Sequence, residues 1–338
     1  MKKRVIGLLM ILCTITLLAG CGNDKKENKM VEVGDYKKIK VDKIDALKVT
    51  DADVEAAIRS DLASLNKNTS VNGPAAKWDT VTIDYVGKLN GEAFSGGTAS
   101  DQQLTLGSGT YIDGFEDGVI GHNVGETFDV KLTFPKNYHN TSLAGKEVVF
   151  TITLDKISRL PELTDEILKD IGTKATTVAE YRELCKKEME VSNLETAKSE
   201  MQEKALDELV KISKLKQRPE DRLVRITRDF VYQESYGAIV NNLSIEESVK
   251  RTYGKSVEEM VDELLTRELA VEYVAEKENL FVSAKEYDEQ VAKMAASYGE
   301  KDVDAFEKSF EMIYGEGYIR RMMLQEKVGA FLAGDAMK

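Results

Sequence analysis

Between residues 80 and 157, apolar and polar residues alternate along three short runs, which is the pattern of half-buried β-strands. The runs are VTIDYV at 81–86, FDVKLTF at 128–134 and VVFTITL at 148–154. Asn90-Gly91 follows the first run, and this dipeptide is typical of the tight type I′ turn of a β-hairpin. Residues 115–120 leave room for one short helix that Gly121 would end. The pattern predicts a small antiparallel sheet wrapped on a short helix.

After residue 157 the apolar residues recur three or four positions apart, which is the spacing of one helix face. Residues 177–213 keep this spacing without Pro or Gly and predict one long helix, roughly 55 Å at about 1.5 Å per residue. No strand pattern is visible in residues 161–338, so this half is predicted to be all-α. Further helices are expected at residues 220–240, 244–252, 256–278, 283–298, 302–310 and 314–333.

The residues before the alternating region carry weaker signals. Residues 36–41 indicate a short strand. Thr50 is predicted to cap a helix, because Asp51 and Asp53 follow in its first turn. Apolar residues then fall on one helix face at Val54, Ala57, Ile58, Leu62 and Leu65.

Length and composition exclude several classes of protein. The chain has 338 residues, enough for two or three domains, and 42% of them are hydrophobic, enough for real cores. Its 31% of charged residues exclude a multi-spanning membrane protein. The formal net charge of −12 argues against a nucleic-acid partner, because binding to phosphates requires patches of Lys and Arg.

The sequence shows no pattern typical of a metal, cofactor or acid–base site. Only Cys185 lies beyond residue 21, and the two histidines, His122 and His139, have no Cys or His at ligand spacing. Neither a dinucleotide fingerprint nor a nucleophile elbow occurs. The carboxylates Glu116 and Asp117 are interpreted as acids that favour the start of a helix. We therefore expect no cofactor and no metal.

Residues 1–21 have the organisation of an export signal. A basic start, Lys2-Lys3-Arg4, precedes apolar residues 5–18, which are too few to span a bilayer comfortably. The end, Leu18-Ala19-Gly20-Cys21, resembles a bacterial lipobox, which implies cleavage before Cys21 and lipidation of its sulfur. The alternative is a plain secretory signal with a chance cysteine. Because two or more acyl chains anchor a protein stably, we expect tethering to the extracytoplasmic face of the cell membrane.

The alternating region carries many short motifs in a fixed order. They are Ile83-Asp-Tyr-Val-Gly87, Gly91-Glu-Ala-Phe94-Ser-Gly-Gly97, Leu106-Gly107, Tyr111-Ile-Asp-Gly-Phe-Glu-Asp-Gly118, Gly125-Glu126, Phe134-Pro135, Tyr138-His139, Leu143-Ala-Gly-Lys146 and Phe150. This order resembles the FKBP-type peptidyl-prolyl isomerase family, in the variant carried by bacterial trigger factor. Residues 36–39, 49–54 and 160–167 also resemble trigger factor, but its basic ribosome-binding loop is missing. Ribosome binding is therefore not expected.

The resemblance implies an α+β chain, in which a small antiparallel FKBP-like sheet precedes an all-α, trigger-factor-like domain. The expected domains are a lipoprotein signal peptide at residues 1–20, a lipid-anchored stalk with a short strand and helix at 21–75, an FKBP-type isomerase domain at 76–160 and a helical, chaperone-like C-terminal domain at 161–338.

Isomerisation of an X-Pro bond requires neither a nucleophile nor a metal. Amide resonance sets a barrier of about 18–20 kcal/mol. The twisted transition state loses the charge-separated resonance form, so a dry apolar slot favours it over the planar ground state. A sequence rich in aromatic residues at the matched motifs agrees with such a slot.

The resemblance also implies which residues form the slot. Catalytic residues are expected at Tyr85, Phe94, Ile112, Phe115 and Phe150. Phe115 would be the floor, and the backbone N–H of Ile112 would hold the substrate carbonyl. Substrate-binding residues are expected at Leu106, Tyr111, Tyr138 and His139, with the last two on the rim. The alternative is that all of these are ordinary core residues of the barrel.

Two departures from the family pattern affect the expected rate. Ser95 stands where many FKBP domains have an acidic residue, and Gln102 falls where they have an aromatic one. The rim loop between Tyr138 and Lys146 is also short, as it is in trigger factor. A pocket that binds proline but turns over slowly is therefore an alternative.

The methionines are concentrated in the second half, since eight of the eleven follow residue 160. Surfaces rich in Met accept many apolar partners, although Met also fills gaps in helical cores. The sequence thus predicts a lipid-anchored foldase that isomerises X-Pro bonds in secreted polypeptides and holds unfolded clients. The alternative is a holdase whose FKBP-like domain binds without catalysis. A solute-binding lipoprotein ranks far behind, because it requires alternating strands and helices throughout.

Overall fold

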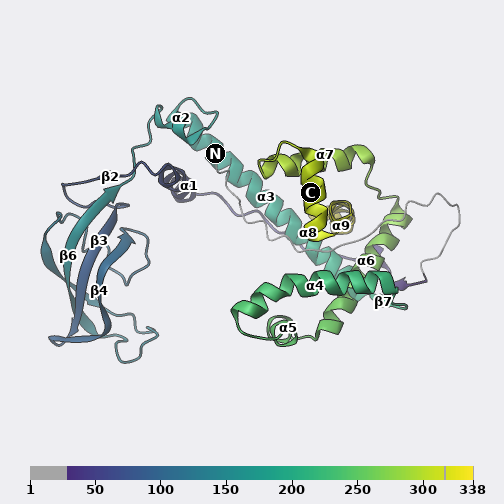
Figure 1. The fold of residues 1–338 in the computed structure, drawn as a ribbon, viewed down its shortest axis with the longest axis horizontal. Helices are drawn as coiled ribbons and strands as arrows, with labels where there is room; N and C mark the ends of the chain where they lie inside the picture. The colour runs from purple at the N-terminus through teal and green to yellow at the C-terminus, as the bar shows by residue number, and fades with distance from the viewer. Residues whose placement is uncertain (1–28, 316, 338) are drawn as a thin grey trace. The chain divides into compact units, whose positions relative to one another are not determined.

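The computed structural model describes residues 29–315 and 317–337, which form two compact units (Figure 1). Residues 49–189 make up the sheet unit, and residues 29–48 with 190–337 make up the helical unit. Helix α3 (Val178–Lys211) begins in the sheet unit and continues into the helical unit. The expected signal peptide and Cys21 lie outside the described residues. The two compact units divide the chain after Lys48 and Met189. The domain boundaries expected at 75/76 and 160/161 stay a prediction.

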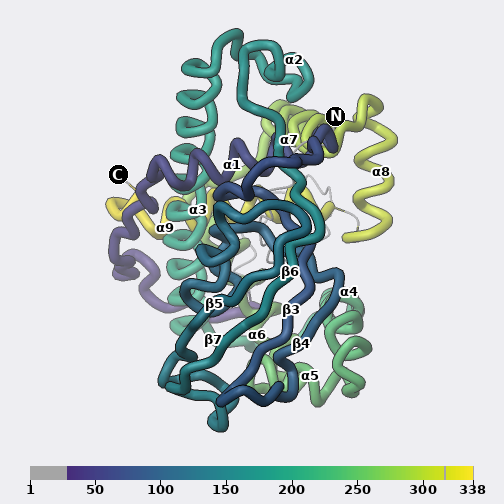
Figure 2. The backbone as a smooth tube through the Cα atoms, turned by 90° about the vertical axis from the view of Figure 1, so that its left-hand side faces the viewer, coloured from purple at the N-terminus to yellow at the C-terminus, as the bar shows by residue number. Residues whose placement is uncertain are grey.

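Five antiparallel strands form the sheet (Figure 2). The strand order is β2 (Thr69–Ser70), β6 (Glu147–Arg159), β3 (Thr80–Leu89), β4 (Glu92–Thr105), and β5 (Thr127–Thr133) also pairs with β6. Alternate residues of β6 are buried, from Val148 to Leu154, because every second side chain points to the core. The three strands predicted from alternation are confirmed, as is the hairpin, in which Asn90 (φ 53°) and Gly91 (φ 88°) join β3 to β4.

The short helix expected at residues 115–120 is replaced by consecutive hydrogen-bonded turns. The N–H of Gly118 donates to the carbonyl of Gly114 at 2.9 Å, and that of Val119 donates to Glu116 at 3.1 Å. Gly114 (φ 86°) and Gly121 (φ 92°) both have left-handed backbone, so no regular helix extends beyond this segment at either end.

Helix α1 (Asp51–Ser64) begins at the predicted cap, because the side chain of Thr50 accepts the N–H of Asp53 and the Asp53 carboxylate accepts that of Thr50. Its apolar face packs against α2 (Ile167–Ile171) and the first turns of α3, forming a second small core in the sheet unit. The hydroxyl of Tyr181 on α3 donates to the Asp61 carboxylate. This arrangement attaches α1 to the residues that follow the sheet.

The helical unit confirms the helices predicted from spacing. They are α4 (Glu220–Val240), α5 (Ile245–Tyr253), α6 (Val257–Glu278), α7 (Ala284–Ser297), α8 (Val303–Tyr314) and α9 (Tyr318–Ala333), followed by the 3-10 helix η2 (Gly334–Met337). Reciprocal Ser–Glu capping boxes start α5, α6 and α7. The largest core is built from α3, α4, α6 and α9, and a smaller one from α7, α8 and α9.

The segment before α1 differs from its prediction. Residues 36–41 form no strand; Tyr36–Lys38 is a 3-10 helix, η1, and the strand β1 lies earlier, at Val31–Val33. It pairs with β7 (Ser213–Leu215), a strand in the half that was predicted to be all-α. The hydroxyl of Tyr36 donates to the Glu278 carboxylate at 2.6 Å, at the end of α6. Residues 29–48 are therefore an integral part of the helical unit.

Among the described residues, no helix combines the length and the apolar character that a membrane crossing requires.

Candidate functional site

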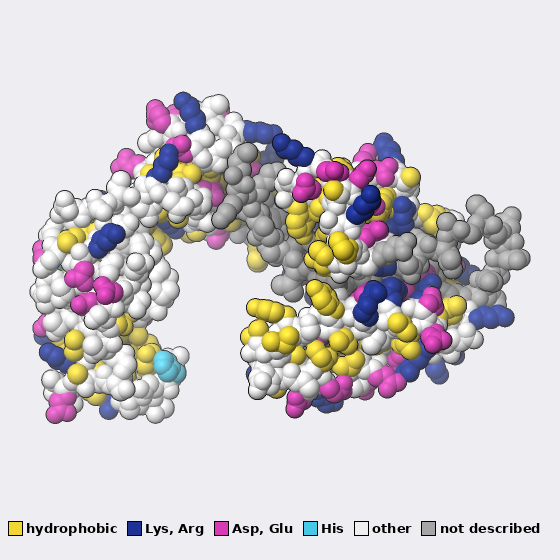
Figure 3. All heavy atoms as spheres, in the orientation of Figure 1, with side chains coloured by type: hydrophobic (Ala, Val, Ile, Leu, Met, Phe, Trp, Pro, Cys, Tyr) yellow, Lys and Arg dark blue, Asp and Glu magenta, His cyan; other side chains and the backbone are white. Residues whose placement is uncertain are grey.

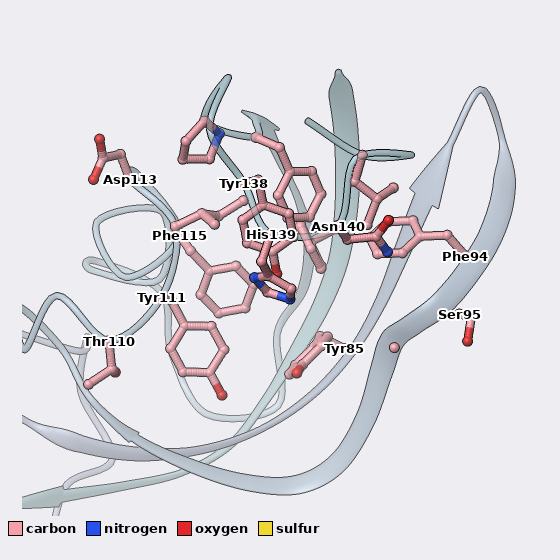
Figure 4. A pocket seen from close by; sticks show the side chains of 16 residues that line it. Tyr85, Phe94, Ser95, Thr110, Tyr111, Asp113, Phe115, Tyr138, His139 and Asn140 are labelled. Carbon is pink, nitrogen blue, oxygen red and sulfur yellow. The ribbon is translucent and has the colours of Figure 1, made fainter. Parts of the chain in front are cut away.

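A cavity of about 610 Å³ opens in the sheet unit, and aromatic side chains are half of the residues that line it (Figure 4). Phe115 lines it and is 1% exposed. Its ring stacks on Tyr111 at a centroid distance of 4.6 Å, and meets Tyr85 and Phe150 edge to face at 5.5 and 5.1 Å. Such edge-to-face contacts hold rings in fixed orientations. The inner part of the cavity is therefore a slot walled by packed aromatic rings.

Phe94 reaches this cavity because β4 contains a large bulge. Val86 pairs with Thr98 and Lys88 pairs with Ala93, so residues 94–97 of β4 lie opposite one residue of β3, Gly87. The Phe94 ring packs against the backbone of Gly97 and Gly87. A Cβ at Gly97 would be 2.5 Å from the ring, and a Cβ at Gly87 would be 2.7 Å from the ring. Two glycines thus provide the space that this wall of the cavity needs.

The backbone N–H of Ile112 has no hydrogen-bond partner within residues 29–315 and 317–337, although the N–H groups just before it are bonded. Ile112 lines the cavity. An unpaired N–H beside an apolar slot is available to an acceptor from another molecule.

Glu116 is 6% exposed and lies under the loop that precedes Ile112. Its carboxylate accepts hydrogen bonds from the backbone N–H groups of four loop residues: Gly107, Gly109, Thr110 and Tyr111. Burial works against the charged form, but the hydrogen bonds from these groups and from the Ser108 hydroxyl outweigh it and hold the pKa of the carboxyl below its usual value. The interpretation of Glu116 as an acid at a helix start was wrong, since no helix begins there.

The Tyr111 phenol of the cavity has a raised pKa. Burial, followed by the influence of Tyr85, raises the pKa of Tyr111 to about 12, so this side chain stays neutral over the physiological range. Within the part of the chain that the structure describes, His, Cys, Asp and Glu form no group of three that could hold a metal.

Comparison with known proteins agrees with the fold. Residues 72–155 match the family model of the FKBP-type peptidyl-prolyl cis-trans isomerase, and residues 177–334 match that of the bacterial trigger factor C-terminus. A trigger factor of Thermoanaerobacter sp. is 37% identical over 293 residues, which are 82% of this chain and 66% of the relative. Those of Limosilactobacillus reuteri and Streptococcus pneumoniae serotype 2 are each 33% identical, over 82% and 79% of this chain and 66% and 65% of the relatives. The chain is a trigger factor-like protein.

This trigger factor-like chain carries an FKBP-type isomerase domain and a trigger factor C-terminal domain, which confirms the predicted fold class. It spans about two thirds of the length of the curated relatives it matches, 65–66%. A solved structure described as "Promiscuous Substrate Recognition in Folding and Assembly Activities of the Trigger Factor Chaperone" covers 90% of this chain and 73% of its own at 21% identity, with a TM-score of only 0.39.

The FKBP-type domain brings together eight of the nine residues expected to form the slot: Tyr85, Phe94, Tyr111, Ile112, Phe115, Tyr138, His139 and Phe150. The ninth, Leu106, is fully buried in the core and does not line the cavity. Of the two departures from the family pattern, Ser95 lines the cavity and Gln102 does not. The catalytic and binding roles of these residues stay predictions.

Two features in or beside the cavity were not predicted from the sequence. Phe134 lines it and meets Phe94 edge to face at 5.9 Å, although the Phe134-Pro135 motif carried no predicted role. Glu116 was missed because a buried acceptor and an acid at a helix start look alike in a sequence. The signal that could have revealed it is the preceding Gly107-Ser-Gly109, whose glycines allow several N–H groups to turn toward one acceptor.

Proposed function

We propose that this protein is an exported, lipid-anchored foldase, which isomerises X-Pro bonds in secreted polypeptides and holds unfolded clients with its helical unit. The observation that carries the isomerase activity is the apolar slot formed by Tyr85, Phe115 and Phe150 beside the free N–H of Ile112. A proline ring fits the character of this slot, and a carbonyl fits the donor.

The mechanism follows from the walls of the slot. The prolyl ring binds on Phe115, and the N–H of Ile112 donates to a substrate carbonyl and fixes the peptide on one side of the bond. Rotation about the bond then weakens the charge separation of the amide, and the surrounding rings favour the less polar, twisted form over the planar one. No proton is transferred, which agrees with a neutral Tyr111 phenol.

Client holding is supported by an exposed apolar face on α4. Tyr232, Tyr236, Ile239 and Val240 are all more than half exposed, and their spacing places them along one face of the helix. Figure 3 shows hydrophobic side chains gathered over α4 and α5. A contiguous exposed apolar patch is typical of a surface that binds other polypeptides.

The end of α8 lies next to this face. A Cβ at Gly315 would be 3.6 Å from the Arg228 side chain of α4. Met312, on the last turn of α8, is 81% exposed, whereas Met201 and Met294 are buried in cores. Methionine therefore fills gaps inside this unit and also provides adaptable surface on α8.

Export and anchoring rest on the sequence of residues 1–21, which lie outside the described residues. The basic start, the apolar stretch and Cys21 support a lipoprotein precursor. Expression of the full chain with labelled palmitate should place label in the membrane fraction, and Cys21→Ala should remove it. Equal labelling of both proteins would contradict anchoring at Cys21.

The isomerase activity can be tested on a chain that begins at residue 22. Exchange spectroscopy by NMR follows cis-to-trans conversion of a short X-Pro peptide, with Phe150→Leu as the test variant. Phe128→Leu is the matched control, because Phe128 lies in the same sheet but outside the cavity. We expect Phe150→Leu to lower kcat/KM at least about tenfold and the control to leave it within about twofold.

A holdase without catalysis is the second candidate. It is favoured by Ser95, which lines the cavity at a position where many FKBP domains carry an acidic residue. Under this alternative, the wild type binds the peptide but does not accelerate its conversion. The same experiment therefore separates the two functions.

A further inference from the structure

We propose that Glu116 is a positioning residue of the isomerase reaction, holding the loop at residues 107–111 in the shape that presents the Ile112 N–H and the Tyr111 ring to substrate. This inference rests on the proposed isomerase function and adds a residue that does not itself line the cavity.

The carboxylate is the common acceptor for this loop. One oxygen accepts the N–H of Gly107 at 2.7 Å and that of Gly109 at 3.0 Å. The other accepts the N–H of Thr110 at 2.9 Å and that of Tyr111 at 3.3 Å. The hydroxyls of Ser108 and Thr110 add two further bonds at 3.0 and 3.3 Å. Every residue of the loop thus donates to this side chain.

The backbone of the loop is shaped to converge on an anion. Gly107 (φ 91°) and Gly109 (φ 72°) have left-handed backbone, which turns successive N–H groups toward the same side. A carboxylate accepts all of them, because it has two oxygens with several lone pairs and no proton to oppose a donor. A glutamine in the same place has one acceptor oxygen, and its NH₂ group faces other donors.

The loop that Glu116 binds determines the direction of the Ile112 N–H. Tyr111 is the last loop residue that Glu116 binds, and the N–H of Ile112, which follows, has no partner among the described residues. The direction of the free N–H is therefore fixed by the bonds that precede it. Tyr111 also stacks on Phe115 at 4.6 Å, so movement of the loop displaces one wall of the slot as well. Within the residues that the structure describes, the side-chain hydrogen bonds of Glu116 all go to this loop.

The test compares Glu116→Gln with Asp117→Asn in the chain that begins at residue 22. Both substitutions remove one negative charge from the same turn, but Asp117 is exposed. A donor that binds the substrate carbonyl in both the ground and the transition state contributes uniform binding. For Glu116→Gln we therefore expect KM to rise about tenfold, which corresponds to the loss of roughly one hydrogen bond to the substrate. The kcat of this variant should stay within about threefold of the wild-type value. Asp117→Asn should change neither.

Two measurements do not require turnover. Titration of the X-Pro peptide by NMR should show a Kd that is about tenfold weaker for Glu116→Gln. Amide hydrogen exchange should be faster at residues 107–112 in this variant and unchanged in β3 and β6. If the wild type binds the peptide but does not accelerate its conversion, the proposed isomerase activity is wrong. The Kd and the amide exchange rates then still show whether Glu116 positions the loop at residues 107–111.

A purely structural role would look different. It would lower the apparent kcat in proportion to the folded fraction, at unchanged KM and Kd, and this result would overturn the inference. Slow exchange at residues 107–112 in Glu116→Gln would overturn it as well. If the wild type binds no X-Pro peptide, the inference fails together with the proposed function.

Discussion

Gly97→Ala tests whether the position of the Phe94 ring sets the activity. The added Cβ would lie 2.5 Å from Cε2 and 2.8 Å from both Cδ2 and Cζ of Phe94. Carbon atoms in contact are separated by about 3.5–4.0 Å, so the ring must move by about 1 Å or more. A displacement of about 1 Å can cost a hundredfold in rate. The backbone of Gly97 lies outside the left-handed region and accepts alanine without strain.

The expected result for Gly97→Ala is a kcat/KM between about ten and a hundred times lower than that of the wild type. The free energy of unfolding should change by no more than about 1 kcal/mol, because Phe94 is only partly buried and can turn outward. The assay is NMR exchange on an X-Pro peptide, with urea unfolding alongside it. Gly73→Ala is the control, since the nearest atom to its Cβ would be 3.9 Å away. Wild-type kcat/KM in Gly97→Ala would refute the reasoning.

Two further predictions concern client holding and pH. A double variant, Tyr232→Ser with Tyr236→Ser, should suppress the aggregation of a denatured client less well than the wild type, because both side chains are mostly exposed on α4. Aggregation is measured by light scattering, and Val191→Ser, on α3, serves as the control. Equal suppression by all three proteins would exclude the α4 face as the client-binding surface. The lowered pKa of Glu116 means that its contribution to stability is present above the unfolded-state pKa of about 4.5 and is lost as pH falls through the lower folded-state pKa. Urea unfolding between pH 6 and about 3 should therefore show a smaller acid loss for Glu116→Gln than for wild type, and parallel curves would contradict this assignment.

The parts of the fold that the sequence predicts are those with a repeated pattern. Strand β6 buries every second residue from Val148 to Leu154, so its period is visible in the residues themselves. The helices are equally regular, and the Ser–Glu pairs that cap α5, α6 and α7 stand in the sequence at the right distance. Eight of the sixteen residues that line the cavity were predicted from the order of family motifs, which periodicity alone does not supply.

The features that escaped prediction depend on contacts between distant or irregular segments. Strands β1 and β7 have three residues each, too few for a period, and their partners are far apart in the chain. Glycines at both ends of residues 115–120 replace the expected helix by turns. Leu106 follows the family order, yet its side chain points into the core. The role of Glu116 depends on where backbone N–H groups point, which the pattern of side chains does not record.

The packing of residues 29–48 into the helical unit also determines the order in which the protein can fold. This segment precedes its partners by a long stretch of chain: β1 pairs with β7, and Tyr36 donates to Glu278. The sheet unit is one continuous stretch, residues 49–189, and has all of its own partners once that stretch is complete. Its folding can therefore finish while the helical unit still lacks its later helices, since contacts between distant residues form late. In a chain that emerges N-terminus first, the aromatic slot can therefore be complete before the helical surface that is proposed to hold clients.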